Sequence, residues 1–442
     1  MAKDNLTSLF TPKQRQVLDQ ELHNPKWTLM INYGAVRAGK TFVDNFVFMF
    51  EVRHAAMVAK NQGIAHPLYI LAGVSSKSIY NNVLTEITNT FGLDFKFDKH
   101  NSFQLKFNDL PPVTIVQTFT GSISGLGAIR GMTATGAYVN EASLANEEVF
   151  TEIRQRCSVE GARVVCDTNP DVPTHWLKTK YIDNPNGSDA IVSNHFVLDD
   201  NTFLNADYVR SLKETTPTGM FYDRSIRGLW VAGEGLVYSD FDKAKNVITR
   251  AKFDERTAGK TLTYYAGVDW GFEHKGVIVV LADDQDGNTY LIKEVTKQHK
   301  QIDYWEGVAR EIRSEFGFNI PFYCDSARPE YVNRFQQQFN AFNAYKSRLT
   351  GVEQVAGQIK LGKFLVIDDA IDKFTDELYQ YVWDEKTGEP IKENDDVMDA
   401  TRYAVATKKW QAEHNNETNL DEQTSVLQQY GLIGQDDDAP WM

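Results

Sequence analysis

The chain has 442 residues, of which 42% are hydrophobic and 24% charged, and this predicts a soluble globular protein of two or three domains. No apolar run is long enough to span a membrane, no signal-peptide pattern is present, and three cysteines without metal spacing argue against a disulfide framework, so we expect a cytosolic protein that contacts no membrane. The net charge of −14 does not exclude a nucleic-acid partner, because the acidic residues after Gln411 (413, 417, 421, 422, 436, 437 and 438), with no Lys or Arg among them, alone supply −7 of it.

Residues 34–41 read Gly-Ala-Val-Arg-Ala-Gly-Lys-Thr and fit the phosphate-binding pattern G-x-x-x-x-G-K-[ST] at every fixed position. The apolar run 27–33 before them predicts a strand, and residues 42–53 after them predict a helix. Strand, loop and helix are the context that the motif requires, so a chance glycine-rich turn is the weaker alternative. Lys40 is expected on the β- and γ-phosphates and Thr41 on Mg²⁺. The residues expected to bind the nucleotide are Gly34, Ala35, Val36, Arg37, Ala38, Gly39, Lys40 and Thr41.

Further apolar runs alternate with helical stretches through the first half of the chain. Strands are predicted at 67–72, 113–119, 137–139 and 163–166. Strands that alternate with helices predict an α/β domain with a parallel sheet covered on both faces.

The predicted strand at 137–139 leads into Asn140 and Glu141. In ATPases with a phosphate-binding loop, an acidic residue at this place polarises the attacking water, beside an Asp that helps to hold Mg²⁺. Glu141 is the candidate for the first role. Because position 140 is Asn, its contact with the metal is expected to be through a neutral amide oxygen or indirect.

Four further features complete the candidate ATP site. Arg37 and Arg130 are candidates to neutralise charge on the γ-phosphate, within one subunit or across to a neighbour, and for Arg130 a surface or DNA-contacting role is an equal alternative. The amide of Gln14 suits an adenine edge, although an exposed polar residue at the start of a helix is equally consistent. Residues 168–170 (Thr-Asn-Pro) could sense the γ-phosphate, but alone they indicate only a turn.

A second unit follows a glycine-rich connector at 228–241. Its predicted elements are strands at 264–269, 276–282, 289–295 and 321–324, with a hairpin turn at 283–288, and helices at 302–316 and 397–410.

Carboxylates end or begin several of these elements. Asp269 and Asp325 each end a predicted strand, and Asp399 lies on the last helix with Asp396 one turn before it. Each could be a solvated turn residue. Together they predict a site for two Mg²⁺ or Mn²⁺ ions, because such ions prefer oxygen ligands and two of them can cleave a phosphodiester. The layout is that of an RNase-H-like nuclease.

The ordered set of motifs resembles the large terminase subunit of tailed bacteriophages, the DNA-packaging ATPase-nuclease, over roughly residues 10 to 410. The matching pieces are 11–14, 34–41, 125–131, 139–141, 168–176, 233–238, 267–271, 325–330 and 399–403. The resemblance implies a RecA-like ATPase domain at 1–235, a linker at 236–260, an RNase-H-like nuclease domain at 261–412 and an acidic, flexible tail at 413–442.

The resemblance also implies a function and its partners. ATP hydrolysis with Mg²⁺ would drive double-stranded DNA into the procapsid, and a nuclease using Mg²⁺ or Mn²⁺ would cut concatemeric DNA at the start and end of packaging. The implied partners are double-stranded DNA, the small terminase subunit and the portal protein, on which the chain would form a homo-oligomeric ring. The implied location is the cytoplasm of the infected bacterium, outside the mature virion.

Residue roles follow from the same resemblance. Lys40 and Thr41 bind the nucleotide and Mg²⁺, Glu141 is the catalytic acid, and Arg130 takes the place of an arginine finger acting on a neighbouring subunit. Residues Thr168, Asn169 and Pro170 form the motif that couples hydrolysis to DNA movement. The implied nuclease metal ligands are Asp269, Asp325 and Asp399, with Asp396 at a position where some relatives carry His or another ligand.

Two other functional classes are consistent with the motifs. One is an ATP-regulated recombinase or transposase, and the other is an ATP-switched assembly protein with an inactive nuclease domain. A locally basic stretch (Lys346, Arg348, Lys360 and Lys363) is a candidate DNA contact, and a solvated face is its alternative.

Overall fold

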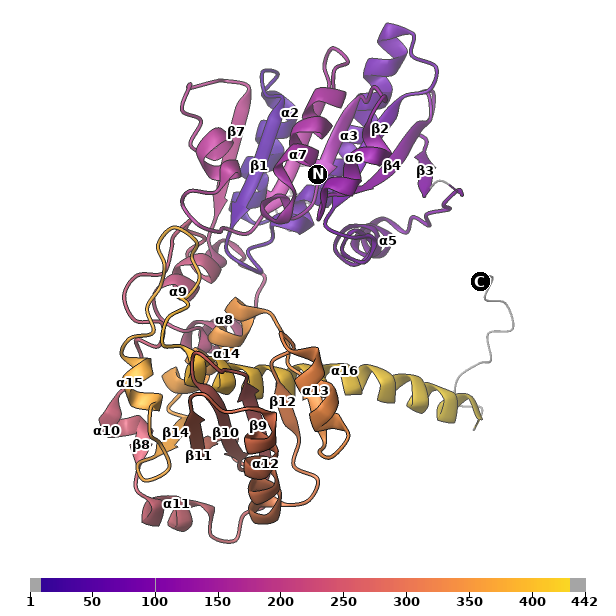
Figure 1. Cartoon of the computed structure of the whole chain (residues 1–442). Coiled ribbons are helices and arrows are strands. Elements are labelled where there is room, and N and C mark those ends of the chain that lie inside the picture. The colour runs from indigo at the N-terminus through magenta and orange to yellow at the C-terminus, as the bar shows by residue number, and fades with distance from the viewer. Residues whose placement is uncertain (1–8, 100, 430–442) are drawn as a thin grey trace. The chain divides into compact units, whose positions relative to one another are not determined.

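The computed structural model describes residues 9–99 and 101–429, and the chain divides into two compact units (Figure 1). The N-terminal unit is Met1–Ala232 together with Lys386–Gly388, and the C-terminal unit is Gly233–Glu385 together with Glu389–Met442. Within the described ranges, no helix is both long enough and apolar enough to cross a membrane.

The N-terminal unit is built on a seven-stranded sheet in the order β3-β4-β2-β5-β6-β1-β7. All neighbours are parallel except β3 and β4, which pair antiparallel at one edge. Its strands are β1 (Leu29–Gly34), β2 (Leu68–Gly73), β3 (Ser102–Leu105), β4 (Val113–Phe119), β5 (Gly136–Val139), β6 (Arg163–Thr168) and β7 (Ile191–Phe196).

Helices lie before, between and after these strands, and those between parallel strands form the crossover connections that such strands need. They are α2 (Pro12–His23), α3 (Lys40–Gln62), α4 (Ser76–Ile79), η1 (Tyr80–Leu84), α5 (Thr85–Phe91), η2 (Ile123–Gly125), α6 (Leu126–Ile129), η3 (Ala142–Leu144), α7 (Glu147–Arg156), η4 (Lys178–Ile182), η5 (Leu198–Asp200), α8 (Ala206–Thr215) and α9 (Met220–Ser225).

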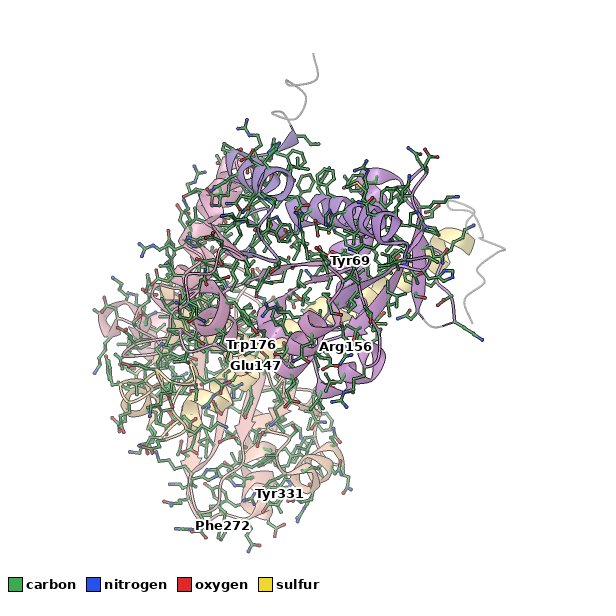
Figure 2. The ribbon with its side chains drawn as sticks, turned by 90° about the horizontal axis from the view of Figure 1, so that it is seen from above. Tyr69, Glu147, Arg156, Trp176, Phe272 and Tyr331 are labelled. Atoms are coloured by element: carbon green, nitrogen blue, oxygen red, sulfur yellow. The ribbon has the colours of Figure 1, made fainter. Side chains whose placement is uncertain are left out.

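Both faces of this sheet are covered, as the alternation of strands and helices predicts. Successive side chains of a strand point to opposite faces, so Met30 of β1 joins the core under α2 and α3, whereas Ile31 joins the core under α6 and α7. Tyr69 of β2, labelled in Figure 2, is fully buried with its ring 5.7 Å from that of Phe48 on α3. Burial on both sides explains why these strands read as nearly continuous apolar runs.

The C-terminal unit contains a second seven-stranded sheet, in the order β13-β12-β9-β10-β11-β14-β8. Strands β9, β10 and β11 form an antiparallel meander, and the outer strands join it in parallel. The strands are β8 (Val247–Ile248), β9 (Thr263–Asp269), β10 (Gly276–Asp283), β11 (Thr289–Lys297), β12 (Phe322–Cys324), β13 (Ala341–Asn343) and β14 (Phe364–Ile367). The helices are α10 (Lys243–Asn246), α11 (Arg250–Thr257), α12 (Ile302–Phe316), α13 (Pro329–Gln336), α14 (Arg348–Lys360), α15 (Phe374–Leu378) and α16 (Asp396–Gln429).

Helix α16 approaches β9 very closely at Gly267. A Cβ atom at this glycine would lie 1.9 Å from the carbonyl oxygen of Ala400, so only a residue without a side chain fits here. This close approach brings the first turns of α16, with Asp396 and Asp399, to the end of β9, where Asp269 lies.

Helix α16 also continues to Gln429, into the segment predicted to be a flexible tail. Residues 411–429 contain no Gly or Pro to stop the helix and several good helix formers. The prediction for 430–442 lies outside the described residues.

Candidate functional site

The loop between β1 and α3 borders a cleft of about 430 Å³ in the N-terminal unit. Lys40 and Thr41 line it, together with Glu141 and Asn140 from the end of β5 and with Thr168 from the end of β6. Because the carboxyl ends of parallel strands meet at one edge of a sheet, residues distant in sequence converge here. The remaining lining residues are Val36, Arg37, Gly39, Phe42, Asn81, Asn82, Glu86, Asp167 and Asn169.

Lys40 is a buried cation at the centre of this cleft. Its Nζ donates to the carbonyl oxygens of Gly34 at 3.0 Å and Ala35 at 2.6 Å, and to Oδ1 of Asn169 at 3.0 Å. Burial lowers the pKa of the Lys40 ammonium to about 8, although Asp167 and other nearby carboxylates oppose the shift. The three acceptors of the Lys40 ammonium are neutral, and a bound polyphosphate would provide negatively charged ones.

Asp167 connects three residues that line the cleft, and the sequence interpretation did not single it out. Its carboxylate accepts from the Thr41 hydroxyl at 2.7 Å, from the Glu141 backbone N–H at 3.1 Å and from Nδ2 of Asn140 at 3.0 and 3.3 Å. The signal was available, because Asp167 is an acid near the end of a predicted strand. Asn140 thus faces Asp167 with its Nδ2, while its own Oδ1 accepts from Asn82 at 3.1 Å.

Glu141 follows β5 in a left-handed conformation, with φ of 54°. This conformation is uncommon for a residue other than glycine, and a Glu adopts it at an energetic cost. The pKa of the half-buried Glu141 carboxyl is raised, first by burial and then by the charge of Asp167, while Lys40 opposes the shift. A carboxylate held in this way can accept a hydrogen bond from a water in the cleft.

The other predicted ATP-site residues divide into two groups. Arg37, with φ of 57°, and Asn169 border the cleft, whereas Pro170 does not. Arg130 is exposed at the end of α6 and does not border the cleft either. Gln14 is buried behind the loop, where its Nε2 donates to the carbonyl oxygen of Gly39 at 2.9 Å.

In the C-terminal unit, a cleft of about 720 Å³ collects carboxylates from β9 and α16. Asp269, Asp396 and Asp399 line it, as the sequence predicts, and Asp395 and His274 line it as well. Neither Asp395 nor His274 was predicted as a site residue, because one more acid in an acidic run and one isolated His carry little signal. The other lining residues are Lys275, Gln298, Lys392, Glu393 and Asn394.

These carboxylates make a strongly negative site around Asp269. The pKa of Asp269 is raised well above its usual value, first by burial and then by the charges of Asp399, Asp325, Asp396 and Asp395. Asp325, which follows β12, does not itself line this cleft, but its charge acts on Asp269. An all-oxygen donor set of this kind fits a hard divalent cation, which would relieve the repulsion among the acids.

Basic side chains pair with several of the same acids. Lys346 donates to Oδ1 of Asp325, and Arg402 lies 3.1 Å from Asp399. Arg348 donates to Asp395 at 2.5 Å. Lys346, Arg348 and Arg402 border a neighbouring cleft of about 530 Å³. The first two belong to the predicted basic stretch, so that part of the stretch lies beside the carboxylates. Lys360 and Lys363 border neither cleft.

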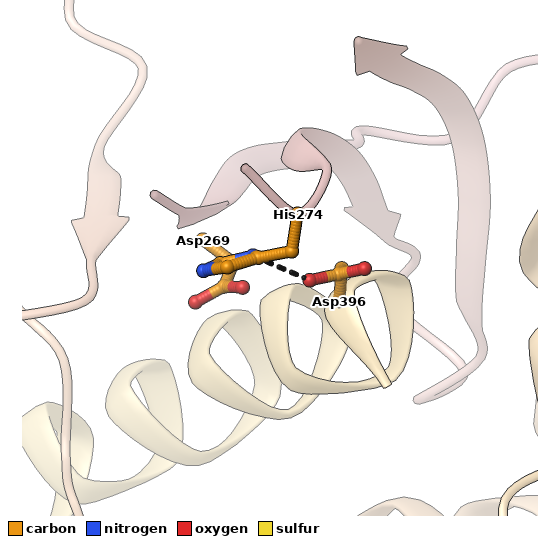
Figure 3. A group of neighbouring side chains, drawn as sticks. All are labelled: Asp269, His274 and Asp396. Atoms are coloured by element: carbon orange, nitrogen blue, oxygen red, sulfur yellow. Dashed lines mark hydrogen bonds and ion pairs between the residues drawn. The ribbon is translucent and has the colours of Figure 1, made fainter. Parts of the chain in front are cut away.

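His274 is an exposed residue that contacts one of these carboxylates. Its Nδ1 lies 2.9 Å from Oδ1 of Asp396 (Figure 3). One ring nitrogen of His274, one carboxylate oxygen of Asp269 and one of Asp396 all lie within 4.8 Å of one another. The three side chains come from the end of β9, the loop after it and the first turn of α16.

Comparison with known proteins identifies relatives of both units. A family model described as "Phage terminase large subunit" matches residues 74–227, and one described as "Terminase RNaseH-like domain" matches residues 266–408. These matches confirm the predicted order of the two domains.

Solved structures of the large terminase from a thermophilic bacteriophage share the fold. One is 23% identical with a TM-score of 0.74 and covers 89% of this chain and 98% of that chain. A complex of the same phage protein with ADP is 24% identical with a TM-score of 0.72, covering 89% of this chain and 98% of that one. Its complex with ATP-γ-S is 25% identical with a TM-score of 0.71, covering 90% of this chain and 99% of that one.

One curated protein also matches a short segment. The flagellar biosynthesis protein FlhA of Borreliella burgdorferi is 37% identical over 89 residues, which is 20% of this chain. The match spans only 12% of that protein's length, so it carries no functional argument.

Proposed function

The chain belongs to the phage large terminase family, and from this premise we propose that it drives double-stranded DNA into a procapsid by ATP hydrolysis and cuts concatemeric DNA when packaging starts and ends. Members of this family are ATPases and nucleases, and the chain is an enzyme of this class. One observation carries the proposal: a phosphate-loop cleft built around Lys40 and a carboxylate cleft built around Asp269 occur in one chain.

In the N-terminal unit, ATP would lie in the cleft that Lys40 lines, as ADP and ATP-γ-S are bound by the large terminase of the thermophilic phage. Lys40 would exchange its carbonyl partners for the β- and γ-phosphates. Thr41 and Asp167, joined at 2.7 Å, would hold Mg²⁺, and Asn140 would orient Asp167. Glu141 would orient the attacking water, whose attack in line with the leaving oxygen releases phosphate.

Arg130 would serve the nucleotide of a neighbouring subunit. This assignment is supported by its exposure and by its absence from the cleft of its own subunit. An arginine that acts in trans needs a ring of subunits, which fits the proposed assembly on a portal protein.

Residues 168–170 would couple hydrolysis to DNA movement. The hydroxyl of Thr168 accepts a hydrogen bond from the Ser143 backbone N–H at 2.9 Å, two residues after Glu141. A movement of Glu141 during hydrolysis would therefore shift Thr168 at the end of β6 through this hydrogen bond.

In the C-terminal unit, Asp269, Asp325, Asp396 and Asp399 would hold Mg²⁺ or Mn²⁺. Bound divalent ions supply an activated water and stabilise the leaving oxygen in phosphodiester hydrolysis. Lys346 and Arg348 border the adjacent cleft and would bind the DNA backbone. The small terminase subunit and the portal protein are the proposed partners, and the cytoplasm of the infected bacterium is the proposed location.

The two activities can be separated by one substitution in each cleft. Lys40→Ala should lower DNA-stimulated ATPase roughly 100-fold or more and stop packaging, yet leave metal-dependent plasmid cleavage intact. Asp269→Ala should abolish cleavage and leave the ATPase intact. The controls are Lys245→Ala and Asp19→Ala, which remove the same charges at side chains that are 79% and 75% exposed.

Three results would contradict the proposal. Loss of both activities in either folded variant would exclude two independent sites. Joining rather than cutting of DNA ends would indicate a recombinase, and no ATP turnover with DNA and procapsid would indicate an assembly switch.

A further inference from the structure

His274 is held at the carboxylate cleft by a tight loop and by a chain of contacts. After β9 the chain turns back so tightly that Gly271 lies against the backbone of Lys275. A Cβ at Gly271 would lie 2.0 Å from the carbonyl oxygen of Lys275. The next residue, Lys275, pairs with Glu377 at 3.0 Å, and Glu377 accepts from the Val397 backbone N–H at 2.6 Å.

These contacts fix the spacing between the loop and α16. Lys275 follows His274 in the chain, and Val397 follows Asp396. The buried Glu377 contacts both Lys275 and Val397, so it links the chain next to His274 with the chain next to Asp396. These neighbouring contacts hold the two backbones in place around the direct contact of 2.9 Å between His274 and Asp396. The His274 side chain itself is 60% exposed. Figure 3 shows the His274 ring next to Asp269, with the contact to Asp396 drawn as a dashed line.

We propose that His274 is a nitrogen ligand of a divalent metal ion that Asp269 and Asp396 also hold, and that it makes this site selective for transition-metal ions over Mg²⁺. The inference rests on the proposed nuclease function of the same cleft and adds a ligand to it. It departs from the expectation of an all-carboxylate site that the four acids suggested.

The spacing of the three side chains fits one ion. Ligand bonds of roughly 2.1 Å place two ligands on opposite sides of an ion about 4.2 Å apart and adjacent ligands closer. The three candidate ligand atoms already lie within 4.8 Å of one another, so small side-chain rotations would bring them to an ion.

The donor set determines which ion is preferred. Mg²⁺ demands oxygen ligands and keeps several waters, whereas imidazole nitrogen suits first-row transition metals. One nitrogen beside two carboxylates therefore favours Mn²⁺, Co²⁺ or Zn²⁺ relative to a site made of oxygen alone.

Mn²⁺ is the probe for this ligand, because its unpaired electrons report a directly bound nitrogen. In nucleotide-free wild-type protein, pulsed electron paramagnetic resonance of added Mn²⁺ should show nitrogen coupling. His274→Ala and His274→Asn should abolish this nitrogen coupling. Both should also weaken Mn²⁺ binding, measured by calorimetry, by at least roughly 10- to 100-fold, which is the loss seen when a group that only supports a metal ligand is removed. His274→Asn, which offers an oxygen, should reduce Mg²⁺ binding less than threefold, a range of about 0.6 kcal/mol.

The matched control is His23→Ala. His23 makes the same kind of contact, Nδ1 to Asp19 at 2.9 Å, but on the exposed surface of α2 in the N-terminal unit. This variant should keep the nitrogen coupling and the Mn²⁺ affinity.

Each other outcome overturns the inference. Coupling that persists in His274→Ala, or is missing from wild type that binds Mn²⁺, would show that His274 is no ligand. Loss of cleavage with unchanged Mn²⁺ binding would assign His274 to proton transfer or DNA contact instead. Plasmid cleavage separates this failure from that of the proposed function, because a wild type that cuts DNA without nitrogen coupling refutes only the ligand.

Discussion

Asn140 donates its side-chain amide to both carboxylate oxygens of Asp167, at 3.0 and 3.3 Å, inside the ATP cleft. Asp167 in turn accepts from the Thr41 hydroxyl at 2.7 Å. The sequence has Asn where the family resemblance leads one to expect Asp. In the structure the acid that contacts Thr41 is instead Asp167 on β6, and the Asn140 amide after β5 donates to it.

The first prediction is that Asn140→Asp impairs the enzyme, although it restores the expected acid. Two carboxylates about 3 Å apart cannot both ionise without strong repulsion, and a donor to Asp167 is lost. We expect the free energy of unfolding to fall by about 1–3 kcal/mol and ATPase activity to fall roughly tenfold or more at neutral pH. Denaturant titration and steady-state ATPase assays measure both.

The matched control for this change is Asn205→Asp. Asn205 caps α8 by accepting from the Asp207 N–H at 2.8 Å, and Asp serves equally well at such a position. Wild-type stability and ATPase in Asn140→Asp would mean that the amide of Asn140 does not orient Asp167.

The second prediction concerns the pH dependence of nucleotide binding. Burial lowers the pKa of Lys40 to about 8, and phosphates bind the ammonium form. ATP affinity should therefore be constant well below pH 8 and fall as pH rises through that value, by at most about tenfold per pH unit. Calorimetric titration with ATP-γ-S between pH 7 and 10 measures the slope.

Lys40→Arg tests whether Lys40 causes that slope. A guanidinium remains protonated over this range, so the variant should bind more weakly but with little dependence on pH. A slope shared by wild type and variant would assign the titration to another group.

The third prediction separates two roles for Gln14. Its amide contacts Gly39 at 2.9 Å and its Oε1 accepts from the Thr11 N–H at 2.9 Å, so it braces the phosphate loop from behind. Gln14→Ala should therefore weaken ATP and GTP binding by the same factor, about tenfold, which corresponds to 1.4 kcal/mol. The exposed Gln16→Ala on the same helix should change neither. A loss confined to ATP would support adenine recognition instead.

The central strands of both sheets could be predicted from the sequence, because they are buried and apolar. β1, β2, β4, β9 and β10 all lie within about two residues of their predicted limits. β3, β7, β8, β13 and β14 were not predicted, since they lie at or next to sheet edges and all but β7 have at most four residues. Such strands carry neither a long apolar run nor a regular alternation.

The candidate sites were predictable where a motif fixes the order of residues. Lys40, Thr41 and Glu141 meet in one cleft as expected. His274 was missed because its meaning depends on Asp396, more than a hundred residues later, which only the approach of α16 to Gly267 brings beside it. No local pattern encodes that contact.

The last prediction concerns Lys346, whose ammonium pairs with the carboxylate of Asp325. A metal ion at Asp325 must compete with this cation, while DNA phosphates would gain from it. Lys346→Ala should therefore raise Mn²⁺ affinity by roughly three- to tenfold, a modest effect because 51% of the Lys346 side chain is exposed to solvent that screens the charge. The same change should weaken DNA binding. The slope of log binding constant against log salt concentration should become shallower by about one, the amount for one lost phosphate contact.

Lys245→Ala removes a lysine that is paired with Asp242 at 3.2 Å and lines neither cleft, so it should change neither quantity. The opposite signs of the two effects make the test specific, because a general loss of structure would weaken both metal and DNA binding. If Lys346→Ala instead lowered Mn²⁺ affinity, the ammonium would be supporting the orientation of Asp325 toward the metal rather than competing with it.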